Sequence, residues 1–180
     1  NSKFSWSNSI RYKSTHNLLG TLETTGEYRP RFMDYQTYLS YTPNERWTID
    51  VIGNINLNNY NFLPVSRETS FGTSQNVKSF RVYFDGQEKD VFKTYYVSAS
   101  ITRHLGKNTR LSLNGAAFST HEKEQYDIRG QYWLTQTETS ENLGVGTYFE
   151  HARNYLNANV RTLKLMLQHR ANKHQVEAAA

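Results

Sequence analysis

The feature that most constrains this chain is a two-residue alternation of apolar and polar side chains. Trp47, Ile49 and Val51 alternate with Thr48 and Asp50. A period of two places successive side chains on opposite faces of a strand, so one face is apolar and the other is wet. The alternation predicts an all-β chain of about seven or eight antiparallel strands. They are expected within residues 4–13, 34–41, 47–58, 77–84, 94–102, 111–117, 126–135 and 158–169.

Several of these predicted strands are as long as strands that cross membranes. They reach the roughly 9 to 11 residues that span a bilayer at a tilt, whereas strands of soluble proteins have about five or six residues. Aromatic residues stand near the strand ends, as in the girdles of membrane barrels. The alternative is that aromatic residues merely favour strands. The residues expected to face lipid are Ile49, Val51, Tyr95, Val97 and Ile101.

Composition excludes several other classes of protein. The chain has no cysteine, which rules out disulfides, cysteine-ligated metals and a thiol nucleophile. Its 13 Tyr, 9 Phe and 3 Trp argue against disorder despite a mean hydropathy of −0.77. The net charge is +5, but lysine and arginine are spread singly along the strands, so a nucleic-acid partner is not expected.

No catalytic or metal-binding motif is recognisable. The run from His121 to Glu124 lacks the second histidine and the helix of a zinc protease motif. Glu122 and Glu124 share one face and suit a cation or a basic ligand, although solvated carboxylates are the commoner case. The glycines at 144 and 146 lack the lysine and helix of a phosphate-binding loop. We therefore expect no enzyme activity, no cofactor and no metal site.

Two polar segments interrupt the alternation and are predicted to be loops, at 59–76 and 136–155. In the first, Tyr60, Phe62 and Arg67 stand among small polar residues, and they are the candidate ligand-binding residues of an extracellular loop. Asp127 and Arg129 share the wet parity of a later segment and are predicted to form a polar pair that faces a lumen. A compact turn is expected at Asp85-Gly86.

Three stretches carry a resemblance to a known family. They are residues 80–90 (FRVYFDGQEKD), 119–134 (STHEKEQYDIRGQYWL) and 144–156 (GVGTYFEHARNYL). In order and spacing they resemble the barrel region of TonB-dependent outer-membrane receptors of the Bacteroidetes type. The resemblance covers roughly residues 34–169. Such receptors have a 22-stranded barrel filled by an N-terminal plug.

The resemblance implies that residues 1–180 are part of a transmembrane β-barrel domain, without the plug, the TonB box and the C-terminal strands. Such a receptor binds a nutrient at the surface of a Gram-negative bacterium and imports it into the periplasm. Its implied partners are outer-membrane lipids and lipopolysaccharide, its own plug and remaining strands, the TonB complex and a surface lipoprotein.

The family topology places the turns at Pro43-Asn44 and Lys107-Asn108 in the periplasm. Residues 77–84 then lie in an extracellular excursion, unless they span the membrane themselves. Two alternatives stay open at this point. One is a self-contained, eight-stranded outer-membrane barrel with an anchoring or adhesive role. The other is a soluble β-sheet domain that binds carbohydrate.

Overall fold

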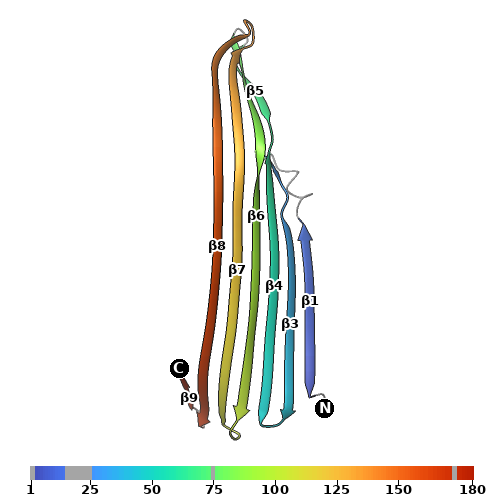
Figure 1. The fold of residues 1–180 in the computed structure, drawn as a ribbon, viewed down its shortest axis with the longest axis vertical. Coiled ribbons are helices and arrows are strands. Elements are labelled where there is room, and N and C mark those ends of the chain that lie inside the picture. Colours follow the sequence, from blue (N-terminus) through green and yellow to red (C-terminus); the bar gives the residue numbers. More distant parts are fainter. Residues whose placement is uncertain (1–2, 15–25, 74–75, 172–173) are drawn as a thin grey trace.

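The computed structural model describes residues 3–14, 26–73, 76–171 and 174–180, and its regular structure is entirely β-strand (Figure 1). The prediction of an all-β antiparallel chain is confirmed. The strands are β1 (Phe4–Ser14), β2 (Gly26–Tyr28), β3 (Arg31–Asn44), β4 (Trp47–Pro64), β5 (Arg67–Thr73), β6 (Asn76–His104), β7 (Thr109–Gln136), β8 (Glu141–Ala171) and β9 (His174–Ala179).

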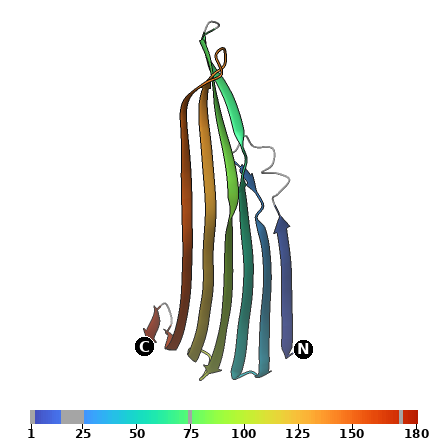
Figure 2. The same cartoon turned by 45° about the horizontal axis from the view of Figure 1, so that its top comes forward.

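All nine strands belong to one antiparallel sheet. The main order is β1-β3-β4-β6-β7-β8-β9, while β2 pairs with β4 and β5 pairs with β6. The described sheet is open, with β1 at one edge and β9 at the other (Figure 2). Strands β6, β7 and β8 have 29, 28 and 31 residues, so they extend well past the 18-residue β4 at one end.

The tight turns lie together at the other end of the sheet. The β3–β4 turn follows Asn44, and the β6–β7 turn lies between His104 and Thr109 (Figure 1, lower end). Residues 77–84 and 95–101 belong to the single strand β6. Because that strand is unbroken, the turn at Lys107-Asn108 lies on the same side as the turn at Pro43-Asn44.

The loop predictions are wrong. Residues 59–73 belong mostly to β4 and β5, 74 and 75 lie outside the described residues, and within 136–155 only residues 137–140 fall between strands. No turn forms at Asp85-Gly86, because Asp85 pairs with Arg129 and Gly86 with Ile128 in a continuous β6–β7 ladder. Long-range strand pairing therefore overrides a local turn signal that depends on only two residues.

The sheet is a single layer, and in the described part of the chain no hydrophobic side chain is buried. A soluble sheet normally packs its apolar face on a second layer. Here large apolar side chains stay exposed, as Leu163 at 74% and Trp6 at 62% illustrate. The fold thus leaves an apolar surface for something outside these residues to cover.

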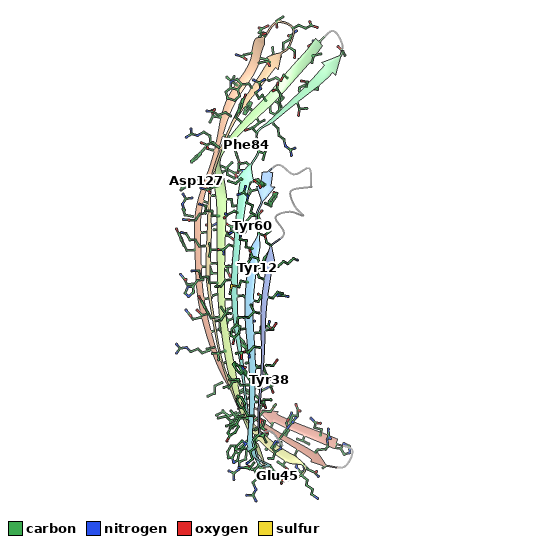
Figure 3. The ribbon with its side chains drawn as sticks, turned by 90° about the vertical axis from the view of Figure 1, so that its right-hand side faces the viewer. Tyr12, Tyr38, Glu45, Tyr60, Phe84 and Asp127 are labelled. Carbon is green, nitrogen blue, oxygen red and sulfur yellow. The ribbon has the colours of Figure 1, made fainter. Side chains whose placement is uncertain are left out.

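Strand register defines the two faces of the sheet. Ile49 pairs with Ile101, Val51 with Ala99, and Gly53 with Val97. The five residues predicted to face lipid therefore share one face, which we call face 1. The opposite face, face 2, carries residues such as Ser98 and Ser100. Figure 3 shows the bowed sheet with side chains on both faces; Asp127 belongs to face 1 and Phe84 to face 2.

The apolar side chains change face partway along the long strands. Near the turns they occupy face 1, up to Tyr95 on β6 and Ala117 on β7. Farther from the turns both faces carry such residues: Tyr83, Trp133, Val145, Phe149 and Tyr155 lie on face 1, and a larger set lies on face 2. Register places on face 2 Tyr60 and Phe62 of β4, Phe80, Val82 and Phe84 of β6, Tyr126, Ile128, Tyr132 and Leu134 of β7, and Tyr148 of β8.

Charged residues are sorted between the faces where this change occurs. Within residues 88–93 and 121–124, acidic side chains occupy even positions and basic side chains occupy odd positions. The bases therefore fall on face 1 and the acids on face 2. We call this level the charge-sorted zone. The face 1 bases are Lys89, Lys93, His121 and Lys123, and the face 2 acids are Glu88, Asp90, Glu122 and Glu124.

Candidate functional site

Two of the three candidate ligand-binding residues lie together on face 2. Tyr60 and Phe62 occupy the far end of β4, and Tyr28 of β2 lies beside both. The Tyr28 ring centroid is 4.7 Å from that of Phe62 and 5.8 Å from that of Tyr60. Arg67 is separate from them. It pairs with Val82 of β6, whereas Phe62 pairs with Glu88, and these two β6 residues are about 20 Å apart along the strand.

Carboxyl groups of the charge-sorted zone lie next to these rings. Asp90 is paired with Tyr60 across β4–β6 and with Glu124 across β6–β7, and Glu88 is paired with Phe62. The side chain of Asp90 is almost fully buried, and its Oδ1 has no hydrogen-bond partner among the described residues. We call Tyr60, Glu88, Asp90 and Glu124 the carboxyl cluster.

Burial and mutual repulsion shape the protonation of this cluster. Burial first, and then the Glu124 carboxylate, raise the pKa of Asp90. Burial and the neighbouring Asp90 raise the pKa of Glu88. Burial, Tyr28 and the two nearby carboxyl groups raise the pKa of Tyr60 to about 12. The repulsion between neighbouring carboxylates would be relieved by a positive group placed beside them, so such a group would be bound favourably.

The chemistry of the cluster suits a cationic organic group better than a metal ion. In the described part of the chain, no three His, Cys, Asp or Glu side chains are placed to hold a metal. An ammonium or guanidinium group would instead offer hydrogen bonds to Asp90 and Glu88, while its apolar stem packed on Phe62 and Tyr28. The cluster is therefore a candidate binding site for a basic ligand.

The cluster predicts an unusual dependence of stability on pH. A carboxyl group with a raised pKa binds its proton more tightly in the folded state, so its contribution is lost as the pH rises through that pKa. Asp90→Asn should therefore gain stability relative to wild type as the pH rises from acid toward neutral. Denaturant unfolding at several pH values measures this, and parallel curves for the two proteins would contradict it.

Asp127 is a control for this prediction, because its pKa is shifted in the opposite direction from that of Asp90. The hydrogen bond from Arg153, followed by the contact with His151, lowers its pKa. Its stabilising contribution is present above the ordinary carboxyl range and is lost as the pH falls. Asp127→Asn should thus be less stable than wild type near neutral pH, and the difference should vanish in acid.

The prediction that places Asp127 and Arg129 on the face opposite Val97 and Ile101 is wrong. Strand β7 is continuous from Thr109, so both residues keep the parity of Leu113 and lie on face 1. Sequence reasoning treated 126–135 as a separate strand and took its aromatic parity as the apolar face. That inference fails because the apolar side chains change face within one strand.

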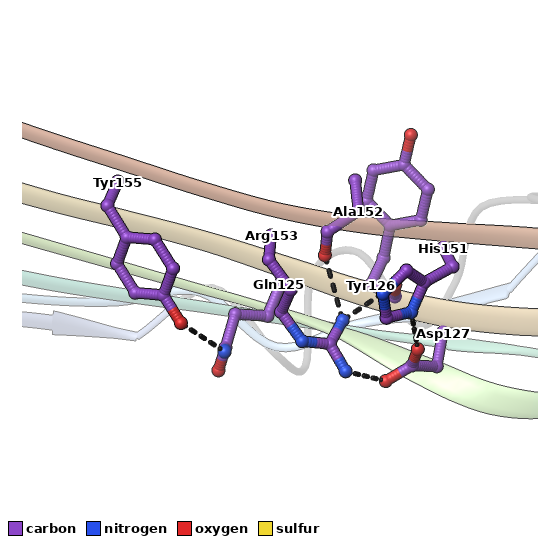
Figure 4. A network of polar contacts seen from close by, with 7 residues as sticks. All are labelled: Gln125, Tyr126, Asp127, His151, Ala152, Arg153 and Tyr155. Carbon is purple, nitrogen blue, oxygen red and sulfur yellow. Dashed lines mark hydrogen bonds and ion pairs between the residues drawn. The ribbon is translucent and has the colours of Figure 1, made fainter.

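Asp127 belongs instead to a polar network between β7 and β8 on face 1 (Figure 4). It forms an ion pair with Arg153 and a hydrogen bond with His151, whose Nδ1 is 2.5 Å from Oδ1. Arg153 also donates to the carbonyl of Tyr126 at 3.1 Å. Exposed pairs of this kind contribute little stability. The network is best understood as tying the extended part of β8 to β7.

Sequence reasoning missed Glu88 and Asp90 as members of a site. A signal was present, because the run Glu88-Lys89-Asp90 alternates in sign with the period of a strand. Glu122 and Glu124 were singled out for the same reason, and register places Glu124 beside Asp90. The long β6–β7 pairing that brings the two runs together could not be predicted from the sequence.

Comparisons of the chain with protein-family models, with curated proteins and with solved structures find no match. Among the described residues, no helix combines the length and apolar character needed to cross a bilayer. The geometry of the sheet and the chemistry of its two faces are therefore the features that bear on function.

Proposed function

We propose that this chain forms part of the wall of an outer-membrane β-barrel of the TonB-dependent receptor type, which imports a nutrient into the periplasm of a Gram-negative bacterium. Face 1 contacts lipid near the turns, and face 2 lines the lumen. The observation that carries the proposal is an exposed apolar band on face 1, interrupted at Asn8 and Thr37, in a sheet whose described residues include no buried hydrophobic side chain. Its height and its inclination can both be derived from the register.

The height of the band fits a bilayer. On β4 the apolar band runs from Trp47 to Leu57 on face 1. Ten residue steps of strand are about 34 Å long, which gives about 26 Å across the membrane at a tilt of about 40°. Transmembrane barrels carry an apolar band of about 25 Å. Residues of the carboxyl cluster lie beyond this band.

The upper edge of the band descends across the sheet. On β1, β3 and β4 it lies at Tyr12, Met33 and Leu57, which form one row. On β8 it lies at Leu163, which stands in the row of Val51, six residues lower on β4. The edge is level from β1 to β4 and drops by about 20 Å between β4 and β8. Averaged over the five strand spacings of about 4.8 Å from β1 to β8, this slope corresponds to strands tilted by about 40°. Strands of membrane barrels tilt by about 35 to 45°.

The other face suits a hydrated lumen. At the level of the band, face 2 carries mainly serine, threonine, asparagine and glutamine side chains, with Ile52, Tyr96 and Phe118 among them. Asp50 accepts a hydrogen bond from Tyr38 on this face at 2.7 Å. Open edges cannot face lipid, so we infer that further strands complete the barrel beside β1 and β9. A plug in the lumen, the TonB complex, lipopolysaccharide and a surface lipoprotein are the proposed partners.

In this arrangement the tight turns are periplasmic and the long ends of β6, β7 and β8 project from the cell surface. The carboxyl cluster then faces the lumen near its outer mouth, where an incoming nutrient first meets the barrel wall. Tyr60 and Phe62 keep their proposed role in ligand binding, whereas Arg67 lies farther out. Transport of this kind requires no catalytic residue and no cofactor from this chain.

The test is to extract the native polypeptide from washed outer membranes and to measure its mass. A membrane-retained polypeptide far heavier than 21.0 kDa supports the transporter. A folded monomer of 21.0 kDa in detergent contradicts it and favours a small closed barrel with an anchoring role. Release of a monodisperse protein into the aqueous wash contradicts both and favours a soluble carbohydrate-binding sheet.

A further inference from the structure

Face 1 contains a hollow at the upper edge of its apolar band. The hollow is about 450 Å³ in volume and spans β3, β4, β6, β7 and β8. Its floor holds the small residues Gly53 and Ala117, which lie in one row with Val97 between them. Tyr35, Ile55 and Tyr95 stand along its upper side in the next row. The small residues Gly53 and Ala117 leave a recess below the larger residues of the next row.

A diagonal of polar residues crosses the sheet at the rim of this hollow. Ser119 on β7 pairs with Tyr95 on one side and with Asn159 on the other. Lys93 and Arg161 are each two residues from those partners, on opposite sides of Ser119 along the strands. Diagonal neighbours of this kind are about 7 to 8 Å apart, so both long side chains can reach a group held above Ser119.

The two cations of this diagonal are available for a ligand. Lys93 and Arg161 are exposed, and neither forms an ion pair with any residue the structure describes. Each is also the first face 1 residue beyond the apolar band on its own strand, following Tyr95 on β6 and Leu163 on β8. The diagonal thus follows the inclined edge of the band.

We propose that Lys93, Ser119 and Arg161 bind the phosphate of an anionic membrane lipid, one acyl chain of which lies in the hollow over Gly53 and Ala117. This inference rests on the proposed function, because it requires face 1 to lie in a bilayer. The charges of the site favour a phosphate headgroup, because the guanidinium of Arg161 and the ammonium of Lys93 lie on either side of the Ser119 hydroxyl and all three groups can donate to phosphate oxygens. The apolar recess below selects a lipid over a free anion.

The position matches the depth of a headgroup. The apolar band ends at Tyr95 and Leu163, and the cations come immediately afterwards, where acyl chains give way to phosphates. Lys89 and Lys123 continue the positive surface farther from the band. No acidic side chain of β6, β7 or β8 lies on face 1 between the band and Asp127, so nothing on these strands competes for the two cations.

Native mass spectrometry of the full protein in nanodiscs of mixed phosphatidylcholine and phosphatidylglycerol tests the proposal. The wild type should retain phosphatidylglycerol selectively after mild delipidation. The double variant Lys93→Gln with Arg161→Gln should lose this selectivity by about tenfold or more, the effect of at least one lost charged hydrogen bond. The charge-matched control is Lys107→Gln with Lys164→Gln, one in a turn and one on face 2.

The possible outcomes distinguish failure of the lipid site from failure of the proposed barrel function. Equal losses in the test and control variants would overturn the site, since only net charge would then matter. Displacement of the lipid by millimolar inorganic phosphate would also overturn it. Ala117→Leu, which fills the hollow without changing charge, should weaken retention as well; unchanged retention would remove the acyl chain from the account. Failure of the wild type to insert into nanodiscs would instead refute the proposed function.

Discussion

Replacing Val97 by arginine is expected to lower the free energy of unfolding in a bilayer by about 1 to 3 kcal/mol, between the cost of a cation at the bilayer midplane and the cost near the interface. Val97 lies on face 1 within the apolar band, in the row of Gly53 and Ala117. Its side chain is 48% exposed, so in the proposed barrel it contacts lipid and not protein.

The neighbouring residue provides the control. Ser98 lies on face 2, paired with Ile52 and Ala116, where the proposed lumen is wet. Ser98→Arg should therefore change stability by less than about 1 kcal/mol. Denaturant titration of both variants refolded into lipid vesicles measures the difference. Equal costs for the two variants would rule out the assignment of the faces.

Gly86→Ala is expected to destabilise the chain by about 2 to 3 kcal/mol, because an L-residue is strained in the backbone conformation found there. Gly86 has a φ of +104° in the middle of β6. A Cβ atom built on it would lie 1.8 Å from the carbonyl oxygen of Asp127 on β7. The ladder between the two strands would have to open locally to admit a methyl group.

Gly144 is the matched control for this substitution. It also lies in a long strand beyond the apolar band, but a Cβ atom added there meets nothing within 4 Å. Gly144→Ala should thus be neutral or slightly stabilising. Thermal unfolding of the two variants compares them directly. If both alanine variants melt together with the wild type, β6 does not require the left-handed backbone at Gly86.

The fold class could be predicted from the sequence because a period of two leaves little choice of secondary structure. Residues such as Ile49 and Val97, far apart in the chain, could be placed on one face by parity alone. The tight turns after Asn44 and after His104 were also predictable, because turn-forming residues separate alternating runs there.

The length of the strands could not be predicted. Polar runs such as 59–64 and 141–155 have the composition of loops, yet they form strands because β6, β7 and β8 pair with one another along their whole length. Pairing over such distances is a tertiary effect that no local window contains. The same effect turned Asp85-Gly86 from a turn signal into part of a strand.

Only part of the candidate site could be predicted from the sequence. Tyr60 and Phe62 stood out as aromatic residues in a polar setting, and the structure keeps them together. Asp90 could not be recognised, since its burial depends on Tyr60 and Glu124 from two other strands. The facing of Asp127 was wrong for a related reason: parity is reliable only when counted along an unbroken strand.

The central claim is that face 1 contacts lipid near the turns and leaves the bilayer at the charge-sorted zone. Since the chain contains no cysteine, single cysteines can be introduced one at a time along β7 without background labelling. The decisive measurement is labelling of each variant in membranes with a water-soluble maleimide, from Leu111 to Leu134.

The account predicts a two-residue pattern near the turns, with positions such as Leu113 and Gly115 protected and Asn114 and Ala116 labelled. The protection of alternate positions should end between Ala117 and His121, beyond which the face 1 positions should label readily. Equal labelling of both parities between Leu111 and Ala117 would contradict the account, because no lipid would then cover face 1.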